Sequence, residues 1–351
     1  MKLALILSFV FTTTLLHAKS FTIMSYNVEN LFDTLHDDGK NDYTWLPLKL
    51  KQSSIEIQQY CSSMRSSHYR RNCLELDWSM NTYKAKIKNL AKVILSFNKG
   101  KGADILVFQE VENKNALKDL IKFGLSTSGY KYISLIEGPD TRGIDVGMIS
   151  RYPIKSETLH KVDISQYSRG RTTRGILETK FKIGSKVVSV FGNHWPSQGN
   201  SDKTRLIASE VLAKKALASN ADLVMAMGDF NQTHSDKPHG INQNILPIFE
   251  DVEVLGRKFS RETALGTHWY RGEWESLDRI FVLKKSLEKN LAYVDYSSFD
   301  IVNKNFMVRD FEWTDFDTGA LNYDENIPWR FDARAYEGFS DHLPVGVKIN
   351  L

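Results

Sequence analysis

The sequence predicts one α/β domain in which two β-sheets pack against each other and helices cover their outer sides. Three observations favour this class. Strand-like and helix-like stretches are mixed along the whole chain, and neither an internal repeat nor a linker-like change in composition divides it. A length of 351 residues permits one large domain or two ordinary ones. A composition that is 42% hydrophobic and 11% aromatic is sufficient for a sizeable core.

The N-terminal segment has the features of an export signal. Lys2 precedes an apolar run from Leu3 to Leu16, and the small residue Ala18 follows shortly after. The run is too short to span a membrane comfortably. We therefore expect residues 1–18 to be a cleaved signal peptide and residues 19–351 to be exported, either to the periplasm or to the medium. A retained membrane anchor is the alternative.

The first half of the chain predicts most of its elements from apolar spacing. Apolar runs indicate strands at residues 21–26, 103–109, 130–136 and 144–150. Apolar residues at intervals of three or four predict a helix over 82–98, and Asn113 is placed to cap a shorter helix. Residues 34–81 look irregular and begin with a turn-rich stretch, so we expect an insertion at one edge of a sheet.

The expected insertion contains both cysteines of the chain, Cys61 and Cys73. In an exported protein, an even and local pair predicts one disulfide that closes a short loop. A zinc site is disfavoured, because no second Cys or His pair has the spacing of metal ligands.

The second half of the chain predicts a hairpin and then alternating elements. Residues 174–181 and 187–191 form the hairpin around a turn at Gly184-Ser185, a helix covers 203–219, and strands occupy 222–227, 277–283 and 345–351. Residues 232–260 show no clear pattern. The segment 296–338 is rich in Asp, Asn and aromatic residues, and we expect long surface loops there.

The overall charge does not indicate a partner. The net charge is +4, from 46 Lys and Arg against 42 Asp and Glu, which is too small an excess to indicate nucleic acid on its own. A local basic patch is present at Arg169, Arg171 and Arg174. This patch either neutralises substrate phosphates or is a solvated loop.

Polar side chains are concentrated where the apolar runs stop. These residues are Asn27, Glu110, Asp145, His194, Asp229, Asn231, Asp278, Asp341 and His342. Active sites gather at strand ends, because the scaffold there is rigid and the side chains are free. Taken one at a time, each residue is equally consistent with a turn former, a helix-start acid or a packed histidine. Their joint occurrence favours a site.

The residue types in this set indicate a particular chemistry. Asn, Glu and Asp offer hard oxygen ligands that suit Mg²⁺, Mn²⁺ or Ca²⁺. Two histidines with carboxylate partners suit general acid catalysis or the stabilisation of an anion, and Asp229 could activate a water molecule. Neither a Gly-rich phosphate loop nor a Gly-x-Ser-x-Gly motif is present. Hydrolysis of a phosphoester with the help of a metal ion fits these residues best.

Six motifs in order carry a family resemblance. They are Ser25-Tyr26-Asn27, Gln109-Glu110-Val111, Asn193-His194-Trp195, Gly228-Asp229-Phe230-Asn231, Leu277-Asp278-Arg279-Ile280 and Ser340-Asp341-His342-Leu343-Pro344. Over roughly residues 21–349 the chain resembles the endonuclease/exonuclease/phosphatase superfamily. The resemblance implies a four-layer α-β-β-α sandwich with two packed mixed or antiparallel sheets. It also implies hydrolysis of phosphodiesters that depends on a divalent metal, with Mg²⁺ expected first and Mn²⁺ or Ca²⁺ as alternatives.

The same resemblance implies roles for individual residues. The metal-site residues are matched by Asn27, Glu110 and Asp341, and a further acid near the metal by Glu29. Asp229 matches the acid that positions or activates water, and Asn231 matches the amide beside it; His342 matches the histidine that faces the scissile phosphate, and Asp278 matches its partner. His194 matches a second histidine of the deoxyribonuclease and sphingomyelinase branches, and Arg174 matches a phosphate-contacting arginine. Asp145 lies in a strand segment typical of the family, with a site role and a packing role both open.

Three functions are compatible with these motifs and this resemblance. The first is an exported, monomeric endonuclease on DNA, or on RNA, with no obligate protein partner; Asn193-His194-Trp195-Pro196-Ser197 is similar to a segment of predicted bacterial secreted nucleases. The second is a sphingomyelinase-like phosphodiesterase that docks on membrane lipid through Trp269, Tyr270 and Trp274. The third is a catalytically silent binding protein.

Overall fold

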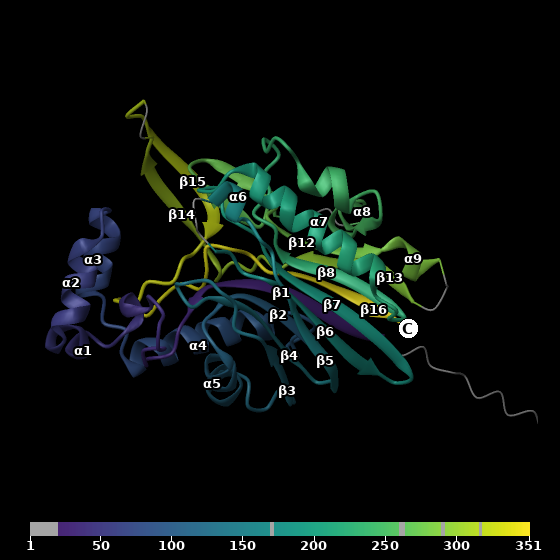
Figure 1. Ribbon diagram of the computed structural model, residues 1–351, viewed down its shortest axis with the longest axis horizontal. Coiled ribbons are helices and arrows are strands. Elements are labelled where there is room, and N and C mark those ends of the chain that lie inside the picture. The colour runs from purple at the N-terminus through teal and green to yellow at the C-terminus, as the bar shows by residue number, and fades with distance from the viewer. Residues whose placement is uncertain (1–19, 169–171, 260–263, 289–291, 316–317) are drawn as a thin grey trace, which may run out of the picture.

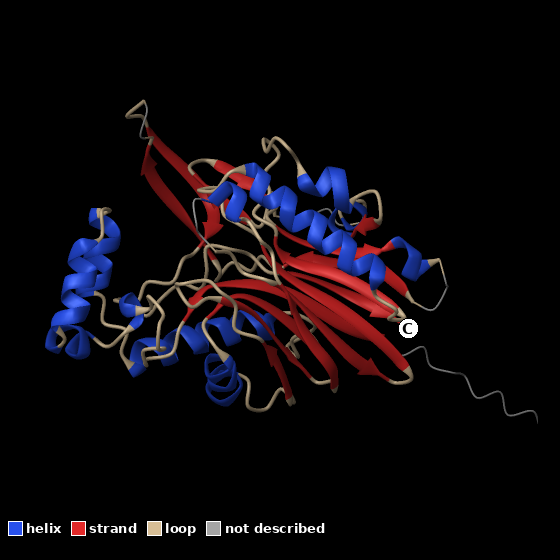
Figure 2. Ribbon diagram, viewed as in Figure 1, coloured by secondary structure: helices blue, strands red, loops and turns tan. Residues whose placement is uncertain are grey.

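The computed structural model describes residues 20–351 apart from 169–171, 260–263, 289–291 and 316–317. The expected signal peptide and two residues of the basic patch, Arg169 and Arg171, lie outside the described residues. Two sheets pack face to face, with helices on their outer sides (Figures 1 and 2). The predicted α-β-β-α sandwich is confirmed.

Each sheet has six strands. The first contains, in spatial order, β13 (Tyr293–Ile301), β16 (Val345–Asn350), β1 (Ser20–Leu31), β2 (Ile105–Val111), β4 (Asp145–Ser150) and β3 (Tyr132–Leu135). The second contains β5 (Ile154–His160), β6 (Ile176–Ile183), β7 (Lys186–His194), β8 (Leu223–Asp229), β12 (Asp278–Leu283) and β9 (Phe249–Asp251). Every strand expected from an apolar run is present, whereas β5, β9 and β13 had no clear apolar signal.

The two sheets share one arrangement at their centres. The central pair of each sheet, β1 with β2 and β7 with β8, is parallel, and every other neighbouring pair in these sheets is antiparallel. In the parallel pairs Asn27 lies opposite Gln109, and His194 lies opposite Asp229. Since the carboxyl ends of parallel strands meet at one edge of a sheet, each sheet delivers its polar strand-end residues to one place.

Helices cover the outer face of each sheet with separate apolar clusters. The helices α4 (Met80–Ser96) and α5 (Lys114–Gly124) join the large cluster that also fills the space between the sheets. The helix α7 (Asp202–Ala218) buries Ala208, Leu212 and Ala216 against the second sheet in its own cluster. Three shorter helical segments are η1 (Tyr43–Trp45), α6 (Ser165–Ser168) and α9 (Lys284–Leu287). In the described part of the chain, no helix has the length and apolar character needed to cross a membrane.

Asn113 caps α5 as the sequence predicts. Its side-chain oxygen accepts the N–H groups of Asn115 and Ala116 at 2.8 and 3.0 Å. Replacing Asn113 by Ala should lower the free energy of unfolding by about 1–2 kcal/mol, because the first turn of α5 loses its acceptor. Urea unfolding followed by circular dichroism measures this loss. Asn113→Ser retains a capping oxygen and should recover part of it; an equal loss in both variants would show that the cap contributes little.

The expectation that residues 34–81 are irregular is wrong. They contain α1 (Leu48–Ser53), α2 (Ile55–Ser63) and α3 (Ser67–Glu75), which stand apart from the sheets at the left of Figure 1. These helices pack around a small apolar cluster that contains Cys61 and Cys73, and the predicted disulfide joins these two residues. Because so few residues of each short helix are buried, the apolar spacing that reveals a helix is missing.

The expectation of long loops over 296–338 is also wrong. β13 completes the first sheet, and β14 (Val308–Thr314) and β15 (Leu321–Pro328) form a hairpin that projects from the body (Figures 1 and 2). Both faces of this hairpin are largely exposed, so its sequence lacks the usual alternation of apolar and polar residues. A second hairpin contains β10 (His268–Tyr270) and β11 (Glu273–Glu275). The unassigned region 232–260 contains η2 (Ile241–Ile245), β9 and α8 (Val252–Gly256).

Candidate active site

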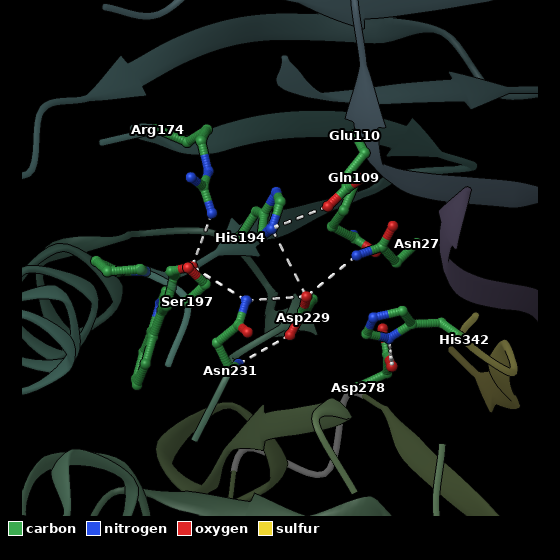
Figure 3. Close-up of polar contacts among 12 residues, drawn as sticks. Asn27, Gln109, Glu110, Arg174, His194, Ser197, Asp229, Asn231, Asp278 and His342 are labelled. Atoms are coloured by element: carbon green, nitrogen blue, oxygen red, sulfur yellow. Dashed lines mark hydrogen bonds and ion pairs between the residues drawn. The ribbon is translucent and has the colours of Figure 1, made fainter. Parts of the chain in front are cut away.

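The polar strand-end residues of both sheets meet in one buried network. Asp229 lies at its centre, at the end of β8 (Figure 3). Its Oδ2 atom accepts hydrogen bonds from the side-chain amides of Asn27 at 3.1 Å and Asn231 at 3.0 Å, and its Oδ1 atom accepts the N–H of Asn231 at 2.8 Å. Burial raises the pKa of the Asp229 carboxyl to about 7, despite the positive charge of His342. The carboxylate is therefore held in one orientation and is more basic than a solvated aspartate.

Backbone conformation explains the glycine and the asparagine of the Gly-Asp-Phe-Asn motif. Gly228 has a φ of +138°, and a Cβ atom there would lie 2.0 Å from the carbonyl oxygen of Asn193 on the neighbouring strand β7. Asn231 has a φ of +48°, a left-handed conformation that asparagine tolerates better than most residues. The motif thus lets β7 and β8 approach closely and then turns the amide of Asn231 back onto Asp229.

The two histidines of the site have opposite electrostatic environments. His342 Nδ1 lies 2.7 Å from Asp278 Oδ2. Burial alone would lower the pKa of His342, but the carboxylates around it, Asp278 first, raise the pKa well above its usual range. Burial and the positive charge of Arg174 hold the pKa of His194 well below its usual range. These surroundings favour the imidazolium form of His342 and the neutral form of His194.

His194 links the two sheets across the site. Its Nε2 atom lies 3.6 Å from Asp229 Oδ2 and 3.8 Å from Glu110 Oε1, on the second and first sheet respectively (Figure 3). Its Nδ1 atom is buried and has no hydrogen-bond partner among the described residues. A neutral ring in this position can offer an N–H to an anion in the site.

Backbone irregularities aim two acids of the first sheet. The pairing of β1 with β2 shifts register between Asn27 and Leu31, and the pairing of β2 with β4 shifts between Phe108 and Val111. Within these shifts Glu29 and Glu110 have φ values of +50° and +63°. Such bulges re-aim side chains, and strained backbone of this kind is concentrated at functional sites.

The donor set fits a hard divalent cation. Glu110 and Asp341 bring carboxylates that remain 19% and 20% exposed, and Asn27 contributes an amide oxygen. In the structure this oxygen accepts the N–H of Glu29 at 3.0 Å, which leaves it one lone pair. Oxygen ligands of this kind match the preference of Mg²⁺, Mn²⁺ and Ca²⁺. Asn27, Glu110 and Asp341 are thus the residues that would hold the ion.

Arg330 is a residue of this site that the sequence analysis missed. Its Nε atom lies 2.7 Å from Glu29 Oε1, and its Nη2 atom lies 3.3 Å from Asp341 Oδ2. Glu29 also accepts the N–H of Asp341 at 3.0 Å, and burial together with Asp341 raises the pKa of Glu29 to about 7. Arg330 follows the β14–β15 hairpin in a segment expected to be loop, and no motif distinguishes it. His268, whose ring lies tilted against that of His342, also belongs to no motif.

Removing the charge of Arg330 should tighten the binding of a divalent cation. Arg330 neutralises two carboxylates at the metal site, so Arg330→Gln should increase the affinity for Mg²⁺ or Mn²⁺ about two- to fivefold, the range expected for an ion pair that is largely exposed. Calorimetric titration measures this change. Arg334→Gln is the control, because Arg334 lies in the same segment and forms no ion pair with Glu29 or Asp341 in the described part of the chain. Equal or weaker binding by the Arg330 variant would contradict the expectation.

Arg174 and Asp145 lie farther from the centre of the site than the residues above. Arg174 is buried, with Nη1 donating to Asp140 at 3.3 Å and Nη2 donating to the Trp195 carbonyl at 2.9 Å. The same carbonyl accepts the side-chain amide of Asn231 at 3.2 Å, so Arg174 connects to the centre of the site through Trp195. Asp145 accepts the N–H of Gly138 at 2.9 Å and forms no hydrogen bond or ion pair with the network in the described residues, which favours its packing role.

Comparisons with known proteins identify the family of the chain. Residues 63–351 match the profile of the Endonuclease/Exonuclease/phosphatase family. Among curated proteins the sequence has no match. Similar solved structures include a D. rerio TDP2 humanized by 14 mutations, which is 14% identical with a TM-score of 0.54 over 95% of this chain and 99% of that chain. Another is a mannosyl-6-phosphatase of Bacteroides thetaiotaomicron, 13% identical with a TM-score of 0.53 over 94% and 99% of the two chains.

ANGEL2, a 2′,3′-cyclic phosphatase, is also similar, with 12% identity and a TM-score of 0.52 over 96% of each chain. At such identities the likeness to solved structures shows the fold alone. The family profile covers most of the chain and includes all but one of the six motifs, Ser25-Tyr26-Asn27. The resemblance read from the sequence is confirmed: the chain belongs to the endonuclease/exonuclease/phosphatase family.

Proposed function

We propose that this protein is a divalent-metal-dependent phosphodiesterase that acts as an exported endonuclease on DNA or RNA. One observation supports the chemistry most strongly. Asp229 and Asp278 lie directly opposite each other on the antiparallel strands β8 and β12, and Asp278 holds His342. A basic carboxylate and a charged imidazole therefore face the same small volume, where a phosphate and its attacking water would sit.

In this proposal Asp229 orients the attacking water and takes its proton. Asn27 and Asn231 fix the carboxylate, and its pKa of about 7 suits proton transfer near neutral pH. Besides holding Asp229, Asn231 can donate to a phosphate oxygen. His342, kept charged by Asp278, stabilises the negative charge that develops on the phosphate, and the neutral His194 donates an N–H to a second oxygen.

Asn27, Glu110 and Asp341 would hold the divalent ion on the first-sheet side of the site. When bound, such an ion supplies positive charge that stabilises the transition state and polarises the phosphate oxygens. Arg174 contributes at longer range, since two of its three nitrogen atoms are bound to Asp140 and Trp195 and only Nε has no partner among the described residues.

The choice of nucleic acid rests on the residue set and on one relative. His194 is shared by the deoxyribonuclease and sphingomyelinase branches that the chain resembles, and Asn193-His194-Trp195-Pro196-Ser197 is similar to a segment of predicted bacterial secreted nucleases. A solved structure of D. rerio TDP2 holds a single-strand DNA product; that protein covers 95% of this chain at 14% identity. Mannosyl-6-phosphatase and 2′,3′-cyclic phosphatase among the similar structures make small phosphoesters necessary controls.

The sphingomyelinase alternative depends on free aromatic side chains, and these are mostly engaged. Trp269 packs edge-on against Phe311 and Trp313 of β14, with ring centroids 5.9 Å apart in both pairs. Trp274 is half-buried against the main core, and Tyr270 alone of the three predicted residues is well exposed, at 61%. The cluster therefore joins two hairpins, and the nuclease remains our proposal.

A substrate panel tests the proposal. The chain from residue 19 is incubated with supercoiled plasmid, single-stranded DNA, RNA, sphingomyelin vesicles, mannose 6-phosphate and a 2′,3′-cyclic nucleotide, with Mg²⁺, Mn²⁺, Ca²⁺ or EDTA. We expect metal-dependent cleavage of nucleic acid that EDTA abolishes. Asp229→Asn, purified in parallel, excludes a contaminating nuclease. Cleavage of a small diester or choline release without nucleic-acid cleavage would overturn the nuclease assignment.

A further inference from the structure

His268 places a second imidazole beside His342. It begins β10, and its backbone pairs with that of His342 in an isolated antiparallel bridge. The Leu343 N–H donates to the Thr267 carbonyl at 2.7 Å, and the two imidazole centroids lie 4.6 Å apart at an angle of 42°. The contact is therefore fixed by backbone pairing and does not depend on the side chains alone.

Asp341 brings a carboxylate to the same point. One ligand atom from each of His268, Asp341 and His342 lies within 4.8 Å of the others, and across the described ranges no other set of three His, Cys, Asp or Glu side chains meets this criterion. Asp341 Oδ1 lies 4.0 Å from His342 Nε2, whereas Oδ2 faces Arg330 at 3.3 Å. The Arg330 ion pair thus leaves Oδ1 available.

This ligand set shares Asp341 with the oxygen set on the first-sheet side, but its other two ligands are imidazoles. Two imidazoles and one carboxylate suit Zn²⁺ and similar transition-metal ions, which accept nitrogen ligands readily, far better than Mg²⁺. His342 also has the outer partner that metal-binding histidines usually have, because Asp278 binds its Nδ1 at 2.7 Å (Figure 3). Its Nε2 atom remains free to face Asp341 Oδ1 at 4.0 Å.

We propose that His268, Asp341 and His342 form an inhibitory site for Zn²⁺. Tetrahedral zinc with bonds of about 2.0–2.1 Å places its ligand atoms about 3.3 Å apart, so shifts of roughly 1 Å would bring the three side chains into position. Nε2 of His342 releases its proton to solvent on binding, as imidazole ligands do. The ring then no longer faces the phosphate. Three protein ligands leave the fourth position of the ion to water.

The inhibitory part of this inference rests on the proposed function, whereas the binding part does not. The first experiment therefore measures binding alone. Zinc is titrated by calorimetry, and Co²⁺, whose tetrahedral complexes absorb strongly in the visible range, reports the ligand geometry. The proteins are the chain from residue 19 and its variants His268→Ala, His268→Asn, His234→Ala and Glu110→Gln.

His268→Ala and His268→Asn should each weaken zinc binding by at least about 100-fold, because losing a ligand costs more than losing an outer partner, which itself costs up to about 100-fold. Both should lose the tetrahedral cobalt spectrum. His234→Ala is the histidine control, since His234 is 77% exposed and pairs with Glu275, the residue opposite His268 on β11, without belonging to the three-ligand group itself. Glu110→Gln, measured without Mg²⁺, should leave zinc binding unchanged while it weakens Mg²⁺ binding, which distinguishes the two sites even though they share Asp341.

The second experiment measures inhibition. Cleavage of the substrate identified by the panel is measured at saturating Mg²⁺ and increasing zinc, and each variant is compared with its own rate without zinc. The zinc concentration that halves the rate should rise in the His268 variants by the same factor by which their zinc affinity falls. Zinc binding that survives both His268 substitutions, or that Glu110→Gln abolishes, would overturn the site. Zinc binding through His268 in a protein that cleaves no phosphoester would overturn the proposed function and leave the site standing.

Discussion

Replacing Asp229 by Asn should lower kcat for phosphodiester cleavage about a thousandfold and change KM little, because the amide cannot take a proton from the attacking water. The carboxylate accepts three hydrogen bonds in the structure, two of them at Oδ2 from side-chain amides. An asparagine there must present an N–H to at least one donor, which also disturbs the orientation of the remaining oxygen. Steady-state kinetics on a soluble diester at saturating Mg²⁺ measure the effect.

Asp222→Asn provides a matched control at the other end of β8. Asp222 immediately precedes β8 at the end opposite to Asp229, where its Oδ2 atom accepts the Val187 N–H at 2.8 Å. This variant makes the same chemical change outside the site and should keep the rate of the unmodified protein. Thermal unfolding of both variants shows whether the fold is intact. A well-folded Asp229 variant with a rate within about tenfold of normal would remove Asp229 from the proton transfer.

Replacing His342 by Ala should cost about a hundredfold to ten-thousandfold in kcat, since the phosphate loses its nearest positively charged donor. His234→Ala, an exposed histidine paired with Glu275, should leave kcat unchanged. If His342→Ala cleaves the diester at a nearly normal rate, His342 does not act on the phosphate.

The partner variant Asp278→Asn should change the pH profile as well as the rate. Asp278 is the largest favourable contribution to the raised pKa of His342, so its neutral replacement lowers that pKa. The imidazolium is then lost at a lower pH, and the alkaline limb of the kcat profile should move toward acid. A profile that keeps its alkaline limb in place would show that His342 is not the group that titrates there.

The sequence predicts those parts of the fold well in which burial requires apolar residues at regular positions. Strands such as β2 and β8 are buried along nearly their whole length and appear as continuous apolar runs. The helix α4 buries one side only and shows the three-to-four spacing. The exposed β14–β15 hairpin and the helices α1–α3 bury too little surface to impose either pattern, so the same reasoning misread them.

The sequence predicts those residues of the candidate site that lie at the ends of such strands. Asn27, Glu110, His194 and Asp229 follow buried runs at the carboxyl ends of parallel pairs, and topology alone brings them together. Arg330 and His268 reach the site from segments near the two hairpins. Their positions depend on tertiary packing that no local pattern encodes, and both lie among residues that are individually unremarkable.

The place of β16 in the first sheet has a consequence for biosynthesis. β16 lies between β13 and β1 and pairs with both. β1 is synthesised first among the strands and β16 last, so β1 has no antiparallel neighbour until synthesis of the sheet is nearly complete. Asp341 and His342 stand immediately before β16 and arrive equally late. A nascent chain therefore lacks both the completed sheet and two members of the site. Under the proposed function, cleavage therefore cannot begin before β16 has been synthesised.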